Sequence, residues 1–188
     1  LDMSGTADFK TNFEELNITP MSISYEYEPC DILKAREIVI SRSQKYVKAE
    51  GEDFQSIVTG IMQQKGNIHM NIGTPLTSDE IAAAALCDKN DRYQLIRHAV
   101  DQRVIDGYKL WKNNYIAYDI ANHGFKYSHL YEPADVEQFV SYMEHQLDKV
   151  EPEVNREDLR RIFLDIYANP VYTKELLENE KRTGNILL

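Results

Sequence analysis

Five histidines are the residues of this chain best suited to act as a general base near neutral pH. They are His69, His98, His123, His129 and His145. A base that activates a hydroxyl needs a carboxylate that orients it, and a zinc site needs ligands at short, regular spacing. His123 and His129 lack both the i, i+4 spacing and a suitable Cys or carboxylate partner. The spacing therefore predicts no metal site, and no bound cofactor is expected either.

The chain's thiols and cations are weaker candidates for chemistry. Cys30 could be a nucleophile only beside a base, and none is indicated, so a packed or partly exposed thiol is the simpler interpretation. Cys30 and Cys87 are too few for a disulfide framework, which favours a reducing compartment. A local basic cluster could meet phosphate or lipid head groups, although solvated helix charge is the favoured interpretation. It consists of Lys34, Arg42, Lys45 and Lys48.

Composition limits the partners of the chain. Its 188 residues are 43% hydrophobic and 28% charged, as in soluble globular proteins, and its formal net charge is −10. That charge argues against a nucleic-acid partner and against broad electrostatic docking to anionic lipid. No apolar run approaches the roughly 20 residues needed to span a bilayer. Peripheral contact with a membrane remains compatible with the local basic cluster.

The stretch 16–29 is an apolar, β-branched run that contains a proline, turns polar, and ends at a second proline. Ile18–Tyr27 is predicted to be a strand, with apolar residues on one side and Ser22 and Ser24 on the other. Pro20 cannot donate to a ladder, which places it near the start of the strand. This stretch resembles the last sequence block of the glycerolipid acyltransferases, the lysophosphatidate acyltransferase family.

In that family the block is an interior strand that shapes the substrate pocket. The resemblance implies that Pro20 and Ser22 bind substrate, although a strand with a proline at its start needs no such role. The segment 65–76, which ends in Gly73-Thr74-Pro75 before an apolar residue, is similar to a later strand of these enzymes. The segments 25–31 and 115–119 are similar to a bacterial subgroup with a helical C-terminal extension. The resemblance covers residues 1–120.

Two upstream blocks of the family are missing from this chain. Its His-x-x-x-x-Asp motif is absent, because the residues five positions after the histidines are Thr74, Arg103, Ser128, Ala134 and Val150. Its Pro-Glu-Gly-Thr/Arg block is absent too, since Glu50-Gly51-Glu52 lacks both the preceding proline and the following Thr or Arg. We therefore expect no catalytic residue here, and a chain that is an inactive C-terminal part of an enzyme.

The resemblance implies an activity for the parent enzyme. It would transfer a fatty acyl group from a thioester, acyl-CoA or acyl carrier protein, to the hydroxyl of a glycerophosphate-type acceptor. The reaction belongs to phospholipid synthesis, and the implied location is cytoplasmic, at the inner face of the membrane. The alternative is a non-catalytic helical module for interaction or regulation.

The elements predicted from periodicity divide the chain into two parts. Residues 1–90 are predicted to be a portion of an α/β domain. Its expected elements, in chain order, are an N-terminal loop over 1–13, the strand near Ile18–Tyr27, helices over 31–41 and 51–64, a half-buried strand over 67–73 and a helix from Ser78. His69 and Asn71 share one face of the second strand. Residues 91–188 read as a mainly helical extension. Within it, 115–120 is a short strand or irregular, and Asn169-Pro170 is expected to break a helix.

Two apolar faces in the extension should pack as an antiparallel helix pair. One comprises Val136, Phe139, Val140, Met143 and Leu147; the other comprises Leu159, Ile162, Phe163 and Ile166. Glu137 and Gln146 are expected on the opposite, solvent-facing side. The incomplete sheet should expose an edge, which we expect to be covered by self-association or by the N-terminal segment.

Overall fold

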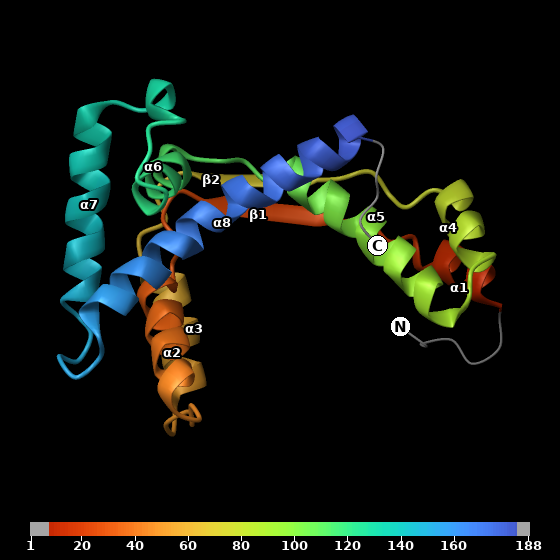
Figure 1. Cartoon of the computed structure of the whole chain (residues 1–188). Coiled ribbons are helices and arrows are strands. Elements are labelled where there is room, and N and C mark those ends of the chain that lie inside the picture. Colours follow the sequence, from red (N-terminus) through yellow and green to blue (C-terminus); the bar gives the residue numbers. More distant parts are fainter. Residues whose placement is uncertain (1–7, 184–188) are drawn as a thin grey trace. The chain divides into compact units, whose positions relative to one another are not determined.

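The computed structural model describes residues 8–183, and within them 65% of the chain is helical with one small antiparallel sheet (Figure 1). Its elements are α1 Phe9–Leu16, β1 Met21–Tyr25, α2 Asp31–Ser43, α3 Glu52–Met62, β2 Ile68–Ile72, α4 Ser78–Ala85, α5 Lys89–Gly107, α6 Lys112–Ala121, the 3-10 helix η1 Ser128–Leu130, α7 Pro133–Leu147 and α8 Arg156–Thr183. The predicted fold class, an α/β fragment followed by a mainly helical extension, is confirmed.

These elements form two compact units that alternate along the sequence. Unit 1 contains the described residues 8–24, 69–109 and 174–183. Unit 2 contains Tyr25–Ile68 and Leu110–Thr173. Each unit has its own cluster of buried apolar residues.

The core of unit 2 confirms the two predicted apolar faces. Phe139 of α7 and Phe163 of α8 are fully buried, with ring centroids 6.4 Å apart, and Phe139 meets Tyr167 edge-on at 5.1 Å. Asn155 begins α8 as predicted, because its side chain accepts a hydrogen bond from the Asp158 N–H at 3.0 Å. Figure 1 shows the chain reversing direction between the end of α7 and the start of α8.

One expected surface residue of this helix pair lies inside. Gln146 is only 1% exposed, and its side-chain carbonyl accepts a hydrogen bond from Lys149 at 2.8 Å. The prediction that Gln146 faces solvent is therefore wrong. Glu137 is exposed, as predicted.

The expected break at Asn169-Pro170 is also wrong, since α8 continues through Pro170 to Thr183. A proline inside a helix removes one backbone hydrogen bond and costs about 3 kcal/mol. Ala168 and Val171, on either side of it, are completely buried. Burial of this stretch of α8 in the core of unit 2 outweighs the local cost.

Residues 115–120, expected as a strand or an irregular segment, lie within α6. Asn114 caps this helix, because its side chain accepts a hydrogen bond from the Trp111 N–H at 2.7 Å. Ile116 and Ala117 are fully buried. Most residues of α6 are buried, so the helix has no clear polar face. Its sequence, in which tyrosines alternate with small and apolar residues, therefore lacks the helical periodicity on which the prediction depends.

The core of unit 1 lies between its short helices and contains Phe13, Leu76, Ile81, Ala84 and Ile96. Phe13 belongs to α1, so the loop predicted over 1–13 is wrong from residue 9 onward, while its residues 1–7 lie outside the described part. Helix α4 begins at Ser78 as predicted, and Thr77 caps it in a reciprocal pair with Glu80. Arg103 of α5 donates to both oxygens of Glu80 at 2.9 and 2.8 Å, which ties α5 to this cap.

Candidate functional site

Strands β1 and β2 form the small sheet and carry the residues for which a substrate-binding role was inferred. At one end the Gly73 N–H donates to the Pro20 carbonyl at 2.8 Å, and at the other the Glu26 N–H donates to the Asn67 carbonyl at 2.9 Å. Both bonds fit one antiparallel register. In that register Ser22 lies opposite Asn71, and Ile23 lies opposite Met70. Pro20 directly precedes β1, as predicted.

The polar face of this sheet is the buried one. Pro20 is buried, and Ser22 and Ser24 are only 4% and 1% exposed. A Cβ added to Gly107 at the end of α5 would lie 2.8 Å from the Ser22 hydroxyl, and closer still to the Asn71 amide. The end of α5 therefore lies directly against this face. Within residues 8–183, the Ser22 and Ser24 hydroxyls have no hydrogen-bond partner.

The apolar face of the sheet, in contrast, is open to solvent. Its four residues in unit 1 are Met21, Ile23, Met70 and Ile72, which are 52%, 40%, 59% and 68% exposed. The alternation predicted for both strands is present, but it points the apolar side outward. We call these four residues the open sheet face.

Helix α3 in unit 2 also has its apolar side exposed to solvent. The helix forms as predicted, but its apolar stripe is exposed, and α3 contains no buried residue. The stripe consists of Phe54, Ile57, Val58, Ile61 and Met62, between 40% and 78% exposed. Exposed apolar groups at regular spacing on one helix are typical of a surface that another molecule or domain covers.

The chain's cations and thiol take mostly structural positions. Lys34 pairs with Glu28 at 2.9 Å and Lys48 with Asp53 at 2.6 Å, which supports the interpretation of the basic cluster as solvated surface charge. Burial, followed by the charge of Glu28, raises the pKa of the Cys30 thiol, so this thiol is poorly suited to act as a nucleophile. His98 is within hydrogen-bond distance of Gln102. No group of three or more His, Cys, Asp or Glu within residues 8–183 is placed to hold a metal ion.

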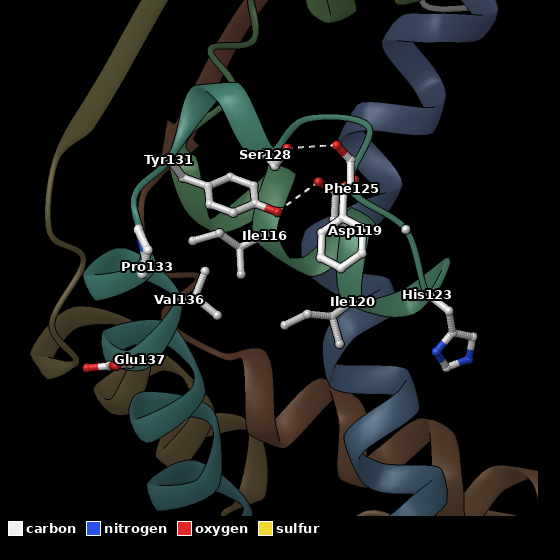
Figure 2. A pocket seen from close by; sticks show the side chains of 11 residues that line it. Ile116, Asp119, Ile120, His123, Phe125, Ser128, Tyr131, Pro133, Val136 and Glu137 are labelled. Carbon is white, nitrogen blue, oxygen red and sulfur yellow. Dashed lines mark hydrogen bonds between the residues drawn. The ribbon is translucent and has the colours of Figure 1, made fainter.

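A separate cavity of about 720 Å³ lies in unit 2, where α6, η1 and α7 meet (Figure 2). Its lining is mainly apolar and includes Ile116, Ile120, Phe125, Tyr131, Pro133 and Val136. Figure 2 shows the Ile116, Tyr131 and Val136 side chains pointing toward one another, whereas His123 and Glu137 point away. We call this the α6–α7 cavity.

Asp119 provides a carboxylate in the wall of the α6–α7 cavity, although its side chain is only 2% exposed. Its Oδ2 accepts hydrogen bonds from the Tyr127 N–H at 2.9 Å and from the Tyr131 hydroxyl at 2.8 Å. Burial, followed by this bond to Asp119, raises the pKa of Tyr131 to about 12, so Tyr131 keeps its proton and donates it. The second oxygen, Oδ1, is buried and has no partner among the described residues.

Sequence reasoning did not find this cavity. In the sequence, Asp119 stands at the end of the similar segment 115–119, and no motif joins it to Tyr131. The two meet because α6 ends at Ala121 and the chain turns back through η1. The sequence signal for it is a single acidic residue, Asp119, in the mainly apolar stretch 115–121.

Comparison with known proteins gives no match to this chain among protein-family models, curated proteins or solved structures. Across residues 8–183, no helix is both long enough and apolar enough to cross a membrane. The sheet, the α3 stripe and the α6–α7 cavity are therefore the features from which a function can be inferred.

Proposed function

We propose that this chain is the C-terminal portion of a glycerolipid-type acyltransferase and is inactive by itself. The parent enzyme transfers a fatty acyl group from acyl-CoA or acyl carrier protein to the hydroxyl of a glycerophosphate-type acceptor. In this proposal it acts in phospholipid synthesis at the cytoplasmic face of the membrane. The base and its orienting carboxylate come from a His-x-x-x-x-Asp motif outside this chain.

The open sheet face is the observation that supports this proposal most strongly. Two strands alone are marginally stable, and an apolar sheet face normally packs on a further layer of helices. Met21 and Ile23 are typical of a strand inside such a layered sheet, yet both are exposed. If β1 belongs to a larger α/β domain, both observations are explained: the exposure of its apolar side and the resemblance of residues 16–29 to the acyltransferase block.

In this proposal, the chain supplies part of the wall of the substrate site and no reacting group. Ser22 and Ser24 each carry a hydroxyl that can donate to a ligand oxygen, and neither hydroxyl has a partner within residues 8–183. Pro20 fixes the backbone where β1 begins. Pro20, Ser22 and Ser24 are buried in this chain, so in this proposal they meet the acceptor only in the complete domain, whose upstream motif would activate its hydroxyl.

Two observations test this proposal together. The coding region upstream of Leu1 should encode a His-x-x-x-x-Asp block followed by a Glu-Gly-Arg/Thr block. The purified chain should show no acyl transfer from acyl-CoA or acyl carrier protein to glycerol 3-phosphate or lysophosphatidate. An unrelated upstream sequence would overturn the proposal. So would turnover by the isolated chain that is lost when one of its five histidines is replaced.

The alternative, a non-catalytic interaction module, is favoured by one observation. The α3 stripe gathers five exposed apolar side chains on a single helix, with Phe54 at 73% and Met62 at 78% exposure. A helix face of this kind can dock into a groove of a partner protein. The upstream sequence separates the two proposals, because a module requires no acyltransferase blocks there.

A further inference from the structure

We propose that the α6–α7 cavity binds a small amphiphile with an aliphatic body and a hydrogen-bond-donating head, either a hydroxyl or a protonated amine. This site is distinct from the sheet residues Pro20 and Ser22. The proposal does not depend on acyltransferase activity, because every residue that carries it lies in unit 2.

The size and lining of the cavity fit an aliphatic body. Ligand sites in proteins commonly enclose about 300–1,000 Å³, and the α6–α7 cavity measures about 720 Å³. Ile120 and Val136 are partly exposed and provide aliphatic surface from two helices, and Phe125 adds a ring that is 83% exposed. An aliphatic ligand would remove these groups from water, which favours binding in proportion to the apolar surface buried.

The unpartnered oxygen of Asp119 defines the head group. A carboxylate only accepts hydrogen bonds, and a buried polar atom without a partner is unfavourable. Oδ2 is already bonded to Tyr127 and Tyr131, which hold the side chain in place. Oδ1 has no partner among the described residues, and it is covered in this structure, so a ligand hydroxyl or ammonium group that donates to it must displace part of the cavity wall.

The charge of the lining excludes an anionic head. Asp119 is the carboxylate in the cavity wall, the Glu137 and His123 side chains point away from the cavity, and no Lys or Arg lines it. The nearby Lys126 has its ammonium over the rings of Tyr118 and Tyr127, at 5.4 and 5.3 Å from their centroids. A phosphate or carboxylate would therefore meet like charge without a cation to balance it.

Binding of three matched six-carbon probes tests the proposal: hexylamine, 1-hexanol and hexanoate. Each is titrated into the ¹⁵N-labelled chain while amide shifts are followed by NMR. We expect shift changes concentrated in residues 116–137, with hexylamine binding at least about tenfold more tightly than hexanoate. Hexanol at the affinity of hexylamine would identify a neutral hydroxyl as the preferred head; weaker hexanol binding would identify an amine.

Two variants and one control link binding to named side chains. Asp119→Asn should reduce the preference for hexylamine over hexanoate to within about threefold, whereas Glu157→Gln, the same chemical change at an exposed position of α8, should leave it unchanged. Val136→Phe should fill the cavity and weaken all three probes by at least about tenfold. If Asp119→Asn fails to fold, the Val136→Phe variant alone tests whether the probes bind in the α6–α7 cavity.

Three outcomes would overturn the proposal. The first is the absence of shift changes in 116–137 at millimolar probe. The second is hexanoate that binds as tightly as hexylamine. The third is binding that Val136→Phe leaves intact.

Discussion

Ile23 on β1 lies opposite Met70 on β2, and both side chains are exposed, by 40% and 59%. The pair occupies a position without direct backbone hydrogen bonds, where opposite side chains approach most closely. Contact between the two side chains stabilises the pairing of β1 with β2, but their outward-facing apolar surface stays in water. Covering the open sheet face would therefore remove four exposed apolar side chains of unit 1 from water.

The isolated chain should associate with itself through the open sheet face. Ile23→Lys combined with Met70→Lys should convert a dimer or larger species to a monomer, because it places charge where apolar surface would be buried. Val47→Lys, at an apolar residue that is 77% exposed in unit 2, is the matched control and should not change the mass. Light scattering measures the outcome. A wild-type chain that is monomeric at all accessible concentrations would contradict this prediction.

Truncation of the unit 2 core should be costly. Phe139→Ala and Phe163→Ala each remove a fully buried ring, and each should lower the free energy of unfolding by about 3–5 kcal/mol. Glu137→Ala on the same helix should stay within about 0.5 kcal/mol, because the side chain is exposed. Urea denaturation compares the three. Equal, small effects would mean that the core lies elsewhere.

The cap of α4 should make stability depend on pH. Burial acts to raise the pKa of Glu80, but hydrogen bonds from Thr77 and Arg103 outweigh it and the pKa is lowered. A carboxyl with a lowered folded-state pKa contributes stability above its unfolded pKa of about 4.3, and this is lost as pH falls through the folded value. Wild type should therefore be more stable than Glu80→Gln at pH 7, with the difference shrinking in acid.

Urea denaturation at a series of pH values measures that difference. Glu14→Gln, in the exposed pair with Lys10 at 3.8 Å, is the control and should show a much smaller dependence. A gap between wild type and Glu80→Gln that widens toward pH 3 would contradict the assignment of Glu80.

The sequence predicted helices well where one face is strongly apolar and buried. The faces around Phe139 and Phe163 follow helical spacing, and both lie in the core of unit 2. Predictions from local sequence, such as a helix break at a proline, were wrong where tertiary packing outweighs the local preference. Pro170 should have broken α8, but Ala168 and Val171 are buried on either side of it.

The candidate sites were less predictable, because each depends on contacts between distant residues. The alternation in β1 correctly separates Ser22 from Ile23, but which side is buried is decided by α5, whose Gly107 lies against Ser22. The α6–α7 cavity requires Asp119 to meet Tyr131 across a turn. Neither arrangement leaves a periodic pattern that can be read from the sequence.

The most direct test of the account is an acyl-transfer assay on an extended chain that includes the coding region upstream of Leu1, with the isolated chain as its matched control. The account predicts transfer from a fatty acyl thioester to a glycerophosphate-type hydroxyl by the extended chain only. That activity should vanish when the upstream motif histidine is replaced by alanine. An extended chain that folds but shows no transfer with either acyl-CoA or acyl carrier protein would contradict the central claim.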